Sequence, residues 1–88
     1  MDRDAVEAAI LKFIGERFLA PKGLDEVGVE EMIFEQGVMD SLGMLELLTF
    51  LEGKFQVSFG SEDLTWENLS TIRQIAQTVL RLQQQLLR

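Results

Sequence analysis

Ser41 is the residue in this sequence whose position best suits it to accept a chemical group. It follows Asp40 and precedes an apolar run, so the pair stands where a helix should begin. Asp and Ser are among the best residues for capping a helix N-terminus, and most such pairs do nothing else. The small turn at residues 37–39, however, presents the serine at the helix N-terminus, where backbone N–H groups and the helix dipole favour an anion. A phosphate attached there would gain roughly 0.3–1 kcal/mol from the dipole, so Ser41 is a candidate attachment site as well as a cap.

The helix that Ser41 opens, predicted from residue 40 or 41 to about residue 56, has two different faces. Its core stripe consists of Met44, Leu47, Leu48, Leu51 and Phe55. The opposite face carries Leu42, Leu45, Glu46, Thr49, Glu52 and Gly53. One explanation of this face is that the preceding loop or a short third helix covers the two leucines. The other is an exposed apolar patch rimmed by carboxylates, which is typical of a surface on which a partner docks.

Little else in the chain could carry chemistry. The sequence has no histidine and no cysteine, so it lacks the usual general base, the usual nucleophile activator and the commonest zinc ligands. No nucleophile–base pair can be assembled, so we predict no catalytic residue and no enzymatic activity. The acidic pairs at residues 30–31 and 62–63 lack the spacing of a calcium-binding loop. We interpret them as solvated surface and predict no metal site.

The length and charge of the chain exclude several further classes of protein. The chain has 88 residues, of which 47% are hydrophobic and 26% charged, and is predicted to form one globular domain over residues 1–88. Its net charge of −7 argues against binding to nucleic acid or to anionic membrane surfaces. No apolar run is long enough to span a bilayer, and the N-terminus is not a basic signal region. We therefore expect no membrane insertion and a cytoplasmic location.

The charges are unevenly distributed along the chain. Residues 1–67 hold all 15 acidic side chains and five of the eight basic ones, whereas residues 68–88 hold three arginines and no acid. We expect the first two helices and their loop to form an acidic surface that faces partners, with a mildly basic tail behind it. Association with basic partners should then weaken as the salt concentration rises.

The hydrophobic spacing predicts an all-α fold, a small bundle of three main helices with a short third helix and a long first loop. The main helices are expected at residues 4–18, from 40 or 41 to 56, and from 70 or 71 to 86, and the short one at 61–64. Pro21 and Gly23 should stop the first helix. The loop over residues 19–40 carries apolar side chains that should pack onto the core. Leu82, Leu86 and Leu87 are expected to extend past the bundle, and we predict fraying or a weak self-association patch there on a protein that is otherwise a monomer.

Several segments of the chain form a specific set when taken together. They are Phe34-Glu35-Gln36-Gly37-Val38-Met39-Asp40-Ser41-Leu42, Glu46-Leu47-Leu48, Phe50-Leu51-Glu52-Gly53-Lys54-Phe55 and Glu67-Asn68-Leu69-Ser70-Thr71-Ile72. In these segments the chain resembles the acyl carrier protein family, including its peptidyl and D-alanyl carrier branches, over nearly its whole length. The helical layout that the periodicity predicts is also the layout of that family.

The resemblance implies a function for Ser41 and for the exposed face of its helix. Ser41 would receive 4′-phosphopantetheine from coenzyme A through a separate phosphopantetheinyl transferase, and Asp40 would position the metal-dependent chemistry of that transferase or cap the helix. Acyl or aminoacyl groups would travel as thioesters on the arm, which fits a chain without its own cysteine. The partner enzymes would read the face that carries Leu42, Leu45, Glu46, Thr49 and Glu52. These partners would be the transferase, acyl-activating or adenylating ligases, and acyltransferases or synthases with basic docking patches, in fatty-acid, polyketide or other specialised pathways.

The sequence also departs from one branch of the family. Carriers for bulk fatty-acid synthesis usually have an acidic residue after Asp-Ser-Leu and a more acidic second helix, whereas this chain has Gly43-Met44 and Gly53-Lys54. Residues 37–40 and Trp66 look more like the discrete carriers that serve dedicated ligases, including D-alanyl carriers. We therefore favour a dedicated carrier for a specialised acyl or aminoacyl pathway. The alternative is an unmodified acidic helical module that binds a partner through the face around Leu42 and Leu45.

Overall fold

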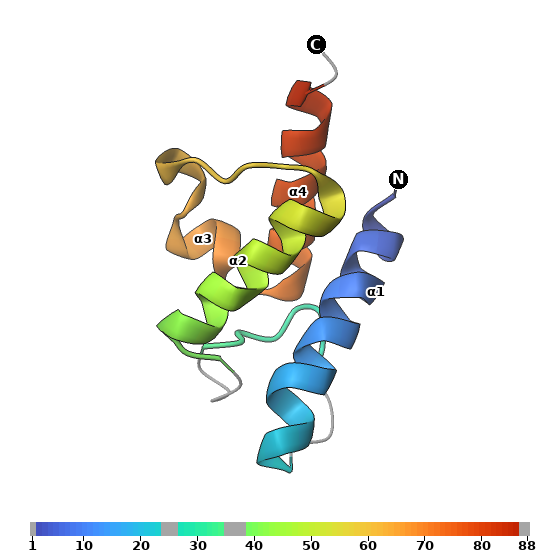
Figure 1. The fold of residues 1–88 in the computed structure, drawn as a ribbon, viewed down its shortest axis with the longest axis vertical. Helices are drawn as coiled ribbons and strands as arrows, with labels where there is room; N and C mark the ends of the chain where they lie inside the picture. The colour runs from blue at the N-terminus through green and yellow to red at the C-terminus, as the bar shows by residue number, and fades with distance from the viewer. Residues whose placement is uncertain (1, 24–26, 35–38, 87–88) are drawn as a thin grey trace.

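The computed structural model describes residues 2–23, 27–34 and 39–86, and the regular structure within them is entirely helical. The elements are α1 (Arg3–Ile14), a π-helical turn (Gly15–Leu19), a 3-10 turn (Ala20–Lys22), α2 (Ser41–Phe55), a second 3-10 turn (Ser61–Asp63), α3 (Trp66–Leu69) and α4 (Ile72–Leu86). In Figure 1, α1 and α4 lie side by side and α2 crosses in front of α4, while the single turn of α3 packs against α4. The predicted all-α bundle with a long first loop is confirmed. None of the described helices combines the length and the apolar character needed to span a membrane.

The first helix begins where the sequence predicts and ends later. The Asp2 side chain caps it by accepting a hydrogen bond from the Ala5 N–H at 2.8 Å. The π-helical and 3-10 turns then continue the helical path to Lys22, so residues 19–22 are helical and do not belong to the loop. The path stops at Gly23, whose positive φ of 70° an L side chain rarely adopts.

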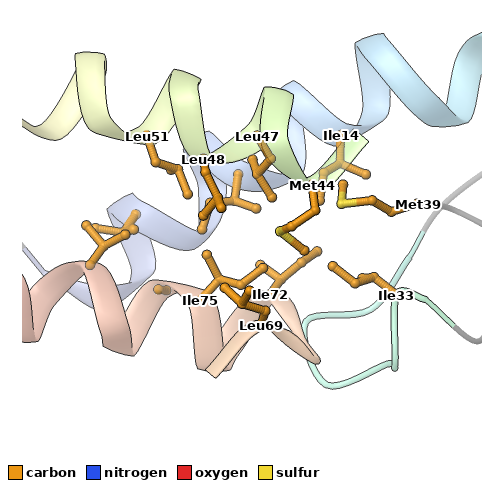
Figure 2. Close-up of a cluster of buried hydrophobic side chains, with 14 of the residues drawn as sticks. Ile14, Ile33, Met39, Met44, Leu47, Leu48, Leu51, Leu69, Ile72 and Ile75 are labelled. Atoms are coloured by element: carbon orange, nitrogen blue, oxygen red, sulfur yellow. The ribbon is translucent and has the colours of Figure 1, made fainter. Parts of the chain in front are cut away.

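The core is formed by one face from each long helix together with side chains of the loop. Figure 2 shows Met44, Leu47, Leu48 and Leu51 of α2 facing Leu69, Ile72 and Ile75, with Ile14, Ile33 and Met39 at one end of the cluster. The predicted core stripe of α2 is therefore confirmed. Leu82 was expected to extend past the bundle, but it is only 6% exposed and belongs to this core. The side chain of Leu86 and the whole of Leu87 lie outside the described residues.

The described part of the first loop packs onto the core, as its apolar residues predict. Val27, Ile33 and Met39 are buried. The Ile33 N–H donates to the Ser70 carbonyl at 3.0 Å, and the Arg73 N–H donates to the Val29 carbonyl at 2.9 Å. Because the first N–H groups of a helix have no partner within the helix, the second of these bonds also satisfies the start of α4.

The short third helix lies later than the sequence predicts. Residues 61–63 form only a 3-10 turn, because the Asp63 carboxylate accepts hydrogen bonds from the Gly60 N–H at 2.9 Å and from Arg81 Nη2 at 3.0 Å. Leu64 then leaves helical geometry, and the Thr65 side chain caps α3 by accepting from the Asn68 N–H at 3.1 Å. The hydrogen bond from Gly60 to Asp63 is local, whereas the contact of Asp63 with Arg81 joins the turn to α4 and could not be predicted from local spacing.

Candidate attachment and docking site

Ser41 is the first residue of α2 and is exposed. Asp40 is the N-cap, since its Oδ1 accepts a hydrogen bond from the Gly43 N–H at 2.7 Å and its carbonyl accepts from the Met44 N–H at 2.9 Å. The predicted cap is thus confirmed, and the serine beside it is free of core packing. An exposed hydroxyl at a capped helix N-terminus suits a phosphate ester, because the helix dipole and the backbone N–H groups favour the negative charge. Of the turn at residues 37–39, only Met39 lies within the described residues.

Gly43 allows the first turn of α2 to lie close to the π-helical turn that follows α1. A Cβ atom at this position would lie 2.9 Å from Phe18 Cε1 and 3.3 Å from both Asp40 Oδ1 and Met39 Cγ. The absent side chain therefore lets the Phe18 ring and the capping carboxylate both lie close to the backbone of α2 at this position. The sequence interpretation did not assign this role to Gly43. The sequence could have indicated this role, because glycine is usually unfavourable inside a helix and its presence there suggests a close contact.

The two leucines of the exposed face of α2 are not covered. Leu42 is 67% exposed and Leu45 is 60% exposed, so neither the described part of the loop nor α3 buries them. Thr49 is also exposed and directs its hydroxyl to the Leu45 carbonyl at 2.9 Å. The interpretation in which loop or third helix covers the leucines is wrong for these residues, and an apolar patch beside Ser41 remains.

The carboxylates around this patch are engaged within the protein. Glu46 Oε2 lies 3.5 Å from Arg17 Nη2, and Glu52 Oε2 accepts a hydrogen bond from the Phe59 N–H at 2.9 Å. Glu52 is half-buried and ties the segment after α2 back onto the helix. The sequence predicts a rim of carboxylates, and the structure shows one of the two acids in an ion pair and the other in a backbone contact. The exposed face of α2 thus combines Leu42 and Leu45 with Glu46, whose charge is opposed by Arg17.

Arg17, Phe13 and Phe50 adjoin this face and were not among the predicted site residues. The Phe13 and Phe50 rings stack with centroids 4.4 Å apart, and the Arg17 guanidinium carbon lies 5.4 Å from the Phe13 centroid. Together with Glu46 and Thr49 they line a groove of about 330 Å³ between α1 and α2. The spacing of residues 13 and 17 indicates that they share one side of a helical segment, but only the tertiary packing shows that they contact α2.

A second exposed apolar pair lies around α3. Leu64 is 45% exposed and Trp66 is 59% exposed, and the Trp66 ring lies 5.1 Å from the ring of Phe34 in the loop. The contact ties the described part of the first loop to the start of α3.

The acidic pairs outside the docking face have structural partners. Glu30 pairs with Arg73 at 3.2 Å, and Asp63 is only 7% exposed, so this acid is not the solvated group that the sequence predicts. Arg73 also lies 3.3 Å from the buried Glu7 carboxylate. Two arginines of the basic tail, Arg73 and Arg81, thus neutralise acids of residues 1–67. No group of three or more acidic side chains that could hold a metal ion occurs among the described residues.

A small helical bundle that offers one exposed serine at a capped helix and an apolar patch beside it has the architecture of a carrier domain. Residues 19–79 match the family model described as the phosphopantetheine attachment site. The chain is 31% identical over 77 residues to the D-alanyl carrier protein of Streptococcus suis (strain 05ZYH33), an alignment that covers 88% of this chain and 94% of the relative. It is 35% identical over 54 residues to the D-alanyl carrier protein of Streptococcus uberis, covering 61% and 68% of the two chains. The D-alanyl carrier protein of Streptococcus pyogenes serotype M1 is 28% identical over 79 residues, covering 90% of this chain and 96% of the relative.

The chain belongs to the acyl carrier protein family, whose members hold a phosphopantetheine group. Its cofactor is therefore covalently attached 4′-phosphopantetheine. Carrier proteins of this family are substrates of phosphopantetheinyl transferases and of the enzymes that load and unload the arm, and are not themselves catalysts. The residues at the N-terminus of α2 fit the group, because an exposed hydroxyl is available there and no described side chain is packed over it.

Proposed function

We propose that this protein carries acyl or aminoacyl groups as thioesters on a 4′-phosphopantetheine arm attached to Ser41. The observation that carries the proposal is the position of Ser41, exposed as the first residue of a helix whose cap is formed by Asp40. The family match over residues 19–79 includes this position. The arm supplies the thiol, so the chain needs only an accessible hydroxyl and a surface that partner enzymes can read.

The attachment would proceed on the Ser41 hydroxyl while the rest of the chain holds it in place. The hydroxyl loses its proton, Oγ forms a bond to the pantetheine-linked phosphorus of coenzyme A, and adenosine 3′,5′-bisphosphate leaves. Asp40 keeps the first turn of α2 in register through its bond to the Gly43 N–H. Because Asp40 is exposed beside Ser41, we also propose that it faces the metal ion held by the transferase. The phosphodiester would then remain at the positive end of α2.

The relatives support an aminoacyl cargo over a fatty acyl cargo. The three relatives named above are D-alanyl carrier proteins, and one of them aligns over 94% of its own length. We therefore propose that a dedicated ligase, which activates an amino acid such as D-alanine with ATP, loads the arm in the cytoplasm. The uncovered leucines Leu42 and Leu45 would serve as the contact surface for that ligase and for the transferase. The less specific alternatives are other acyl groups delivered to acyltransferases or synthases.

The attachment is tested by measuring the intact mass of the protein after incubation with coenzyme A and a broad-specificity phosphopantetheinyl transferase. We expect the wild-type chain to gain one phosphopantetheine and the Ser41→Ala variant to gain none. Ser58→Ala is the matched control, because Ser58 is also an exposed serine but does not begin a helix. An unmodified wild-type chain, or full modification of Ser41→Ala, would refute the proposal and leave an unmodified helical interaction module.

A further inference from the structure

The groove between α1 and α2 does not include Ser41, but three of its lining residues follow Ser41 on the same helix. Its floor is the stacked pair of Phe13 and Phe50, and its rim carries opposite charges, Arg17 in the π-helical turn after α1 and Glu46 on α2. The two side chains are 58% and 43% exposed, and their closest atoms are 3.5 Å apart. Exposed ion pairs of this kind contribute little to folding. Both charges therefore remain available to exchange their mutual contact for contacts with a partner.

The groove is close enough to Ser41 to be covered by an enzyme that binds around this residue. Glu46 and Thr49 follow Ser41 by five and eight residues on the same helix, which is roughly 7.5 and 12 Å along the helix axis at 1.5 Å per residue. A typical specific interface buries about 800 Å² on each partner, equivalent to a disc of about 16 Å radius. An enzyme whose contact is centred on Ser41 thus covers the groove as well as Leu42 and Leu45.

The rigidity of the site supports the same conclusion. Phe18 packs onto Gly43, so the π-helical turn that follows α1 is held against the first turn of α2. Arg17 precedes Phe18 and lies over the Phe13 ring, so the positive charge is held on one side of the groove and the negative charge on the other. Such a fixed order of charges can set the orientation in which a partner docks.

We propose that the phosphopantetheinyl transferase docks across this groove and reads the order of the two charges. In this arrangement the transferase inserts an apolar side chain over Phe13 and Phe50, presents a carboxylate to Arg17 and presents a basic side chain to Glu46. The docking surface therefore extends from α2 onto α1 and is not a uniformly acidic face that meets a uniformly basic patch. This inference rests on the proposed function of Ser41.

The test exchanges the two charges. The double variant Arg17→Glu/Glu46→Arg keeps an ion pair within the carrier but reverses its direction, whereas Arg17→Gln removes one charge without introducing repulsion. The measurements are KM and kcat for the modification of each variant by the transferase, followed by intact mass, with circular dichroism and thermal melting as checks of the fold. Lys54→Glu is the matched control, because Lys54 is an exposed basic residue near the other end of α2.

We expect the double variant to fold normally and to show about a tenfold rise in KM with kcat nearly unchanged, since reversed charges oppose the partner and do not touch the reacting atoms. Arg17→Gln should show a smaller rise in KM, and Lys54→Glu should behave like the wild type. If the double variant matches the wild type, the ion pair is only an internal contact and the docking inference is wrong, while the carrier function stands. If the wild-type chain accepts no phosphopantetheine, the proposed function itself fails and the inference falls with it.

Discussion

The contribution of the Asp40 N-cap to the stability of α2 can be tested directly by substitution. The Asp40 Oδ1 atom accepts the Gly43 N–H at 2.7 Å, and replacement by alanine removes this acceptor. Loss of a capping side chain typically costs about 1 kcal/mol, within a range of roughly 0.5–2 kcal/mol. For a domain of this size that corresponds to a fall of roughly 4–8 °C in Tm. Asp40→Asn keeps an oxygen in the same place and loses only part of the attraction to the helix dipole, so we expect it to cost about 0.5 kcal/mol or less.

The assay is thermal melting of the wild type and the two Asp40 variants, monitored by circular dichroism at one protein concentration. The alanine variant should melt several degrees lower than the asparagine variant. Equal melting temperatures for all three chains would refute the stabilising role of the cap. Transferase kinetics then separate stability from attachment. If the Asp40 charge faces the transferase metal, the asparagine variant should fold well and yet be modified more slowly.

Three further substitutions probe the structure away from the cap. Asp63→Ala removes a buried carboxylate that accepts hydrogen bonds from two donors, and it should lower the free energy of unfolding by about 1.5–3 kcal/mol in a urea titration. Its control, Glu62→Ala, should change this free energy by less than about 0.5 kcal/mol. Similar values for the two variants would contradict the assigned contacts. Gly43→Ala should destabilise the protein by about 1–3 kcal/mol, because the added Cβ would contact the Phe18 ring. Gly53→Ala, on the same helix, places its Cβ in open space and should stabilise the protein by roughly 0.5–1 kcal/mol. The reverse order would refute the packing argument. Leu45→Ala should leave the urea midpoint nearly unchanged and raise KM for the transferase, and an unchanged KM would move the docking face elsewhere.

The local pattern of the sequence predicts a large part of the fold and the position of the candidate site. Helical spacing identifies the buried face of α2 because it depends only on which residues share one side of a helix. The cap at Asp40 follows from residue type in the same way. The exposure of Leu42 and Leu45 could not be decided from spacing, since it depends on where the loop and α3 lie.

The remaining differences come from contacts between residues far apart in the sequence. Glu46 was assigned to the exposed face of α2, but its ion pair with Arg17 could not be predicted, because Arg17 lies in another helical segment. The third helix was placed too early because residues 61–63 form only a 3-10 turn, whose Asp63 carboxylate is also held by Arg81 from α4. Leu82 was assigned to a projecting end, although the bundle is long enough to bury it. In each case hydrophobic spacing specifies the helix, and its neighbours in space decide the role of the side chain.

The central claim is that Ser41 holds the phosphopantetheine arm, and the most direct measurement is peptide mapping by tandem mass spectrometry of the protein isolated from its native host. We predict that the peptide containing Ser41 carries one phosphopantetheine, bound through the serine oxygen, and that an aminoacyl or acyl thioester on its thiol is lost on treatment with hydroxylamine. A peptide that contains unmodified Ser41 throughout, or an arm attached to another residue, would contradict the account.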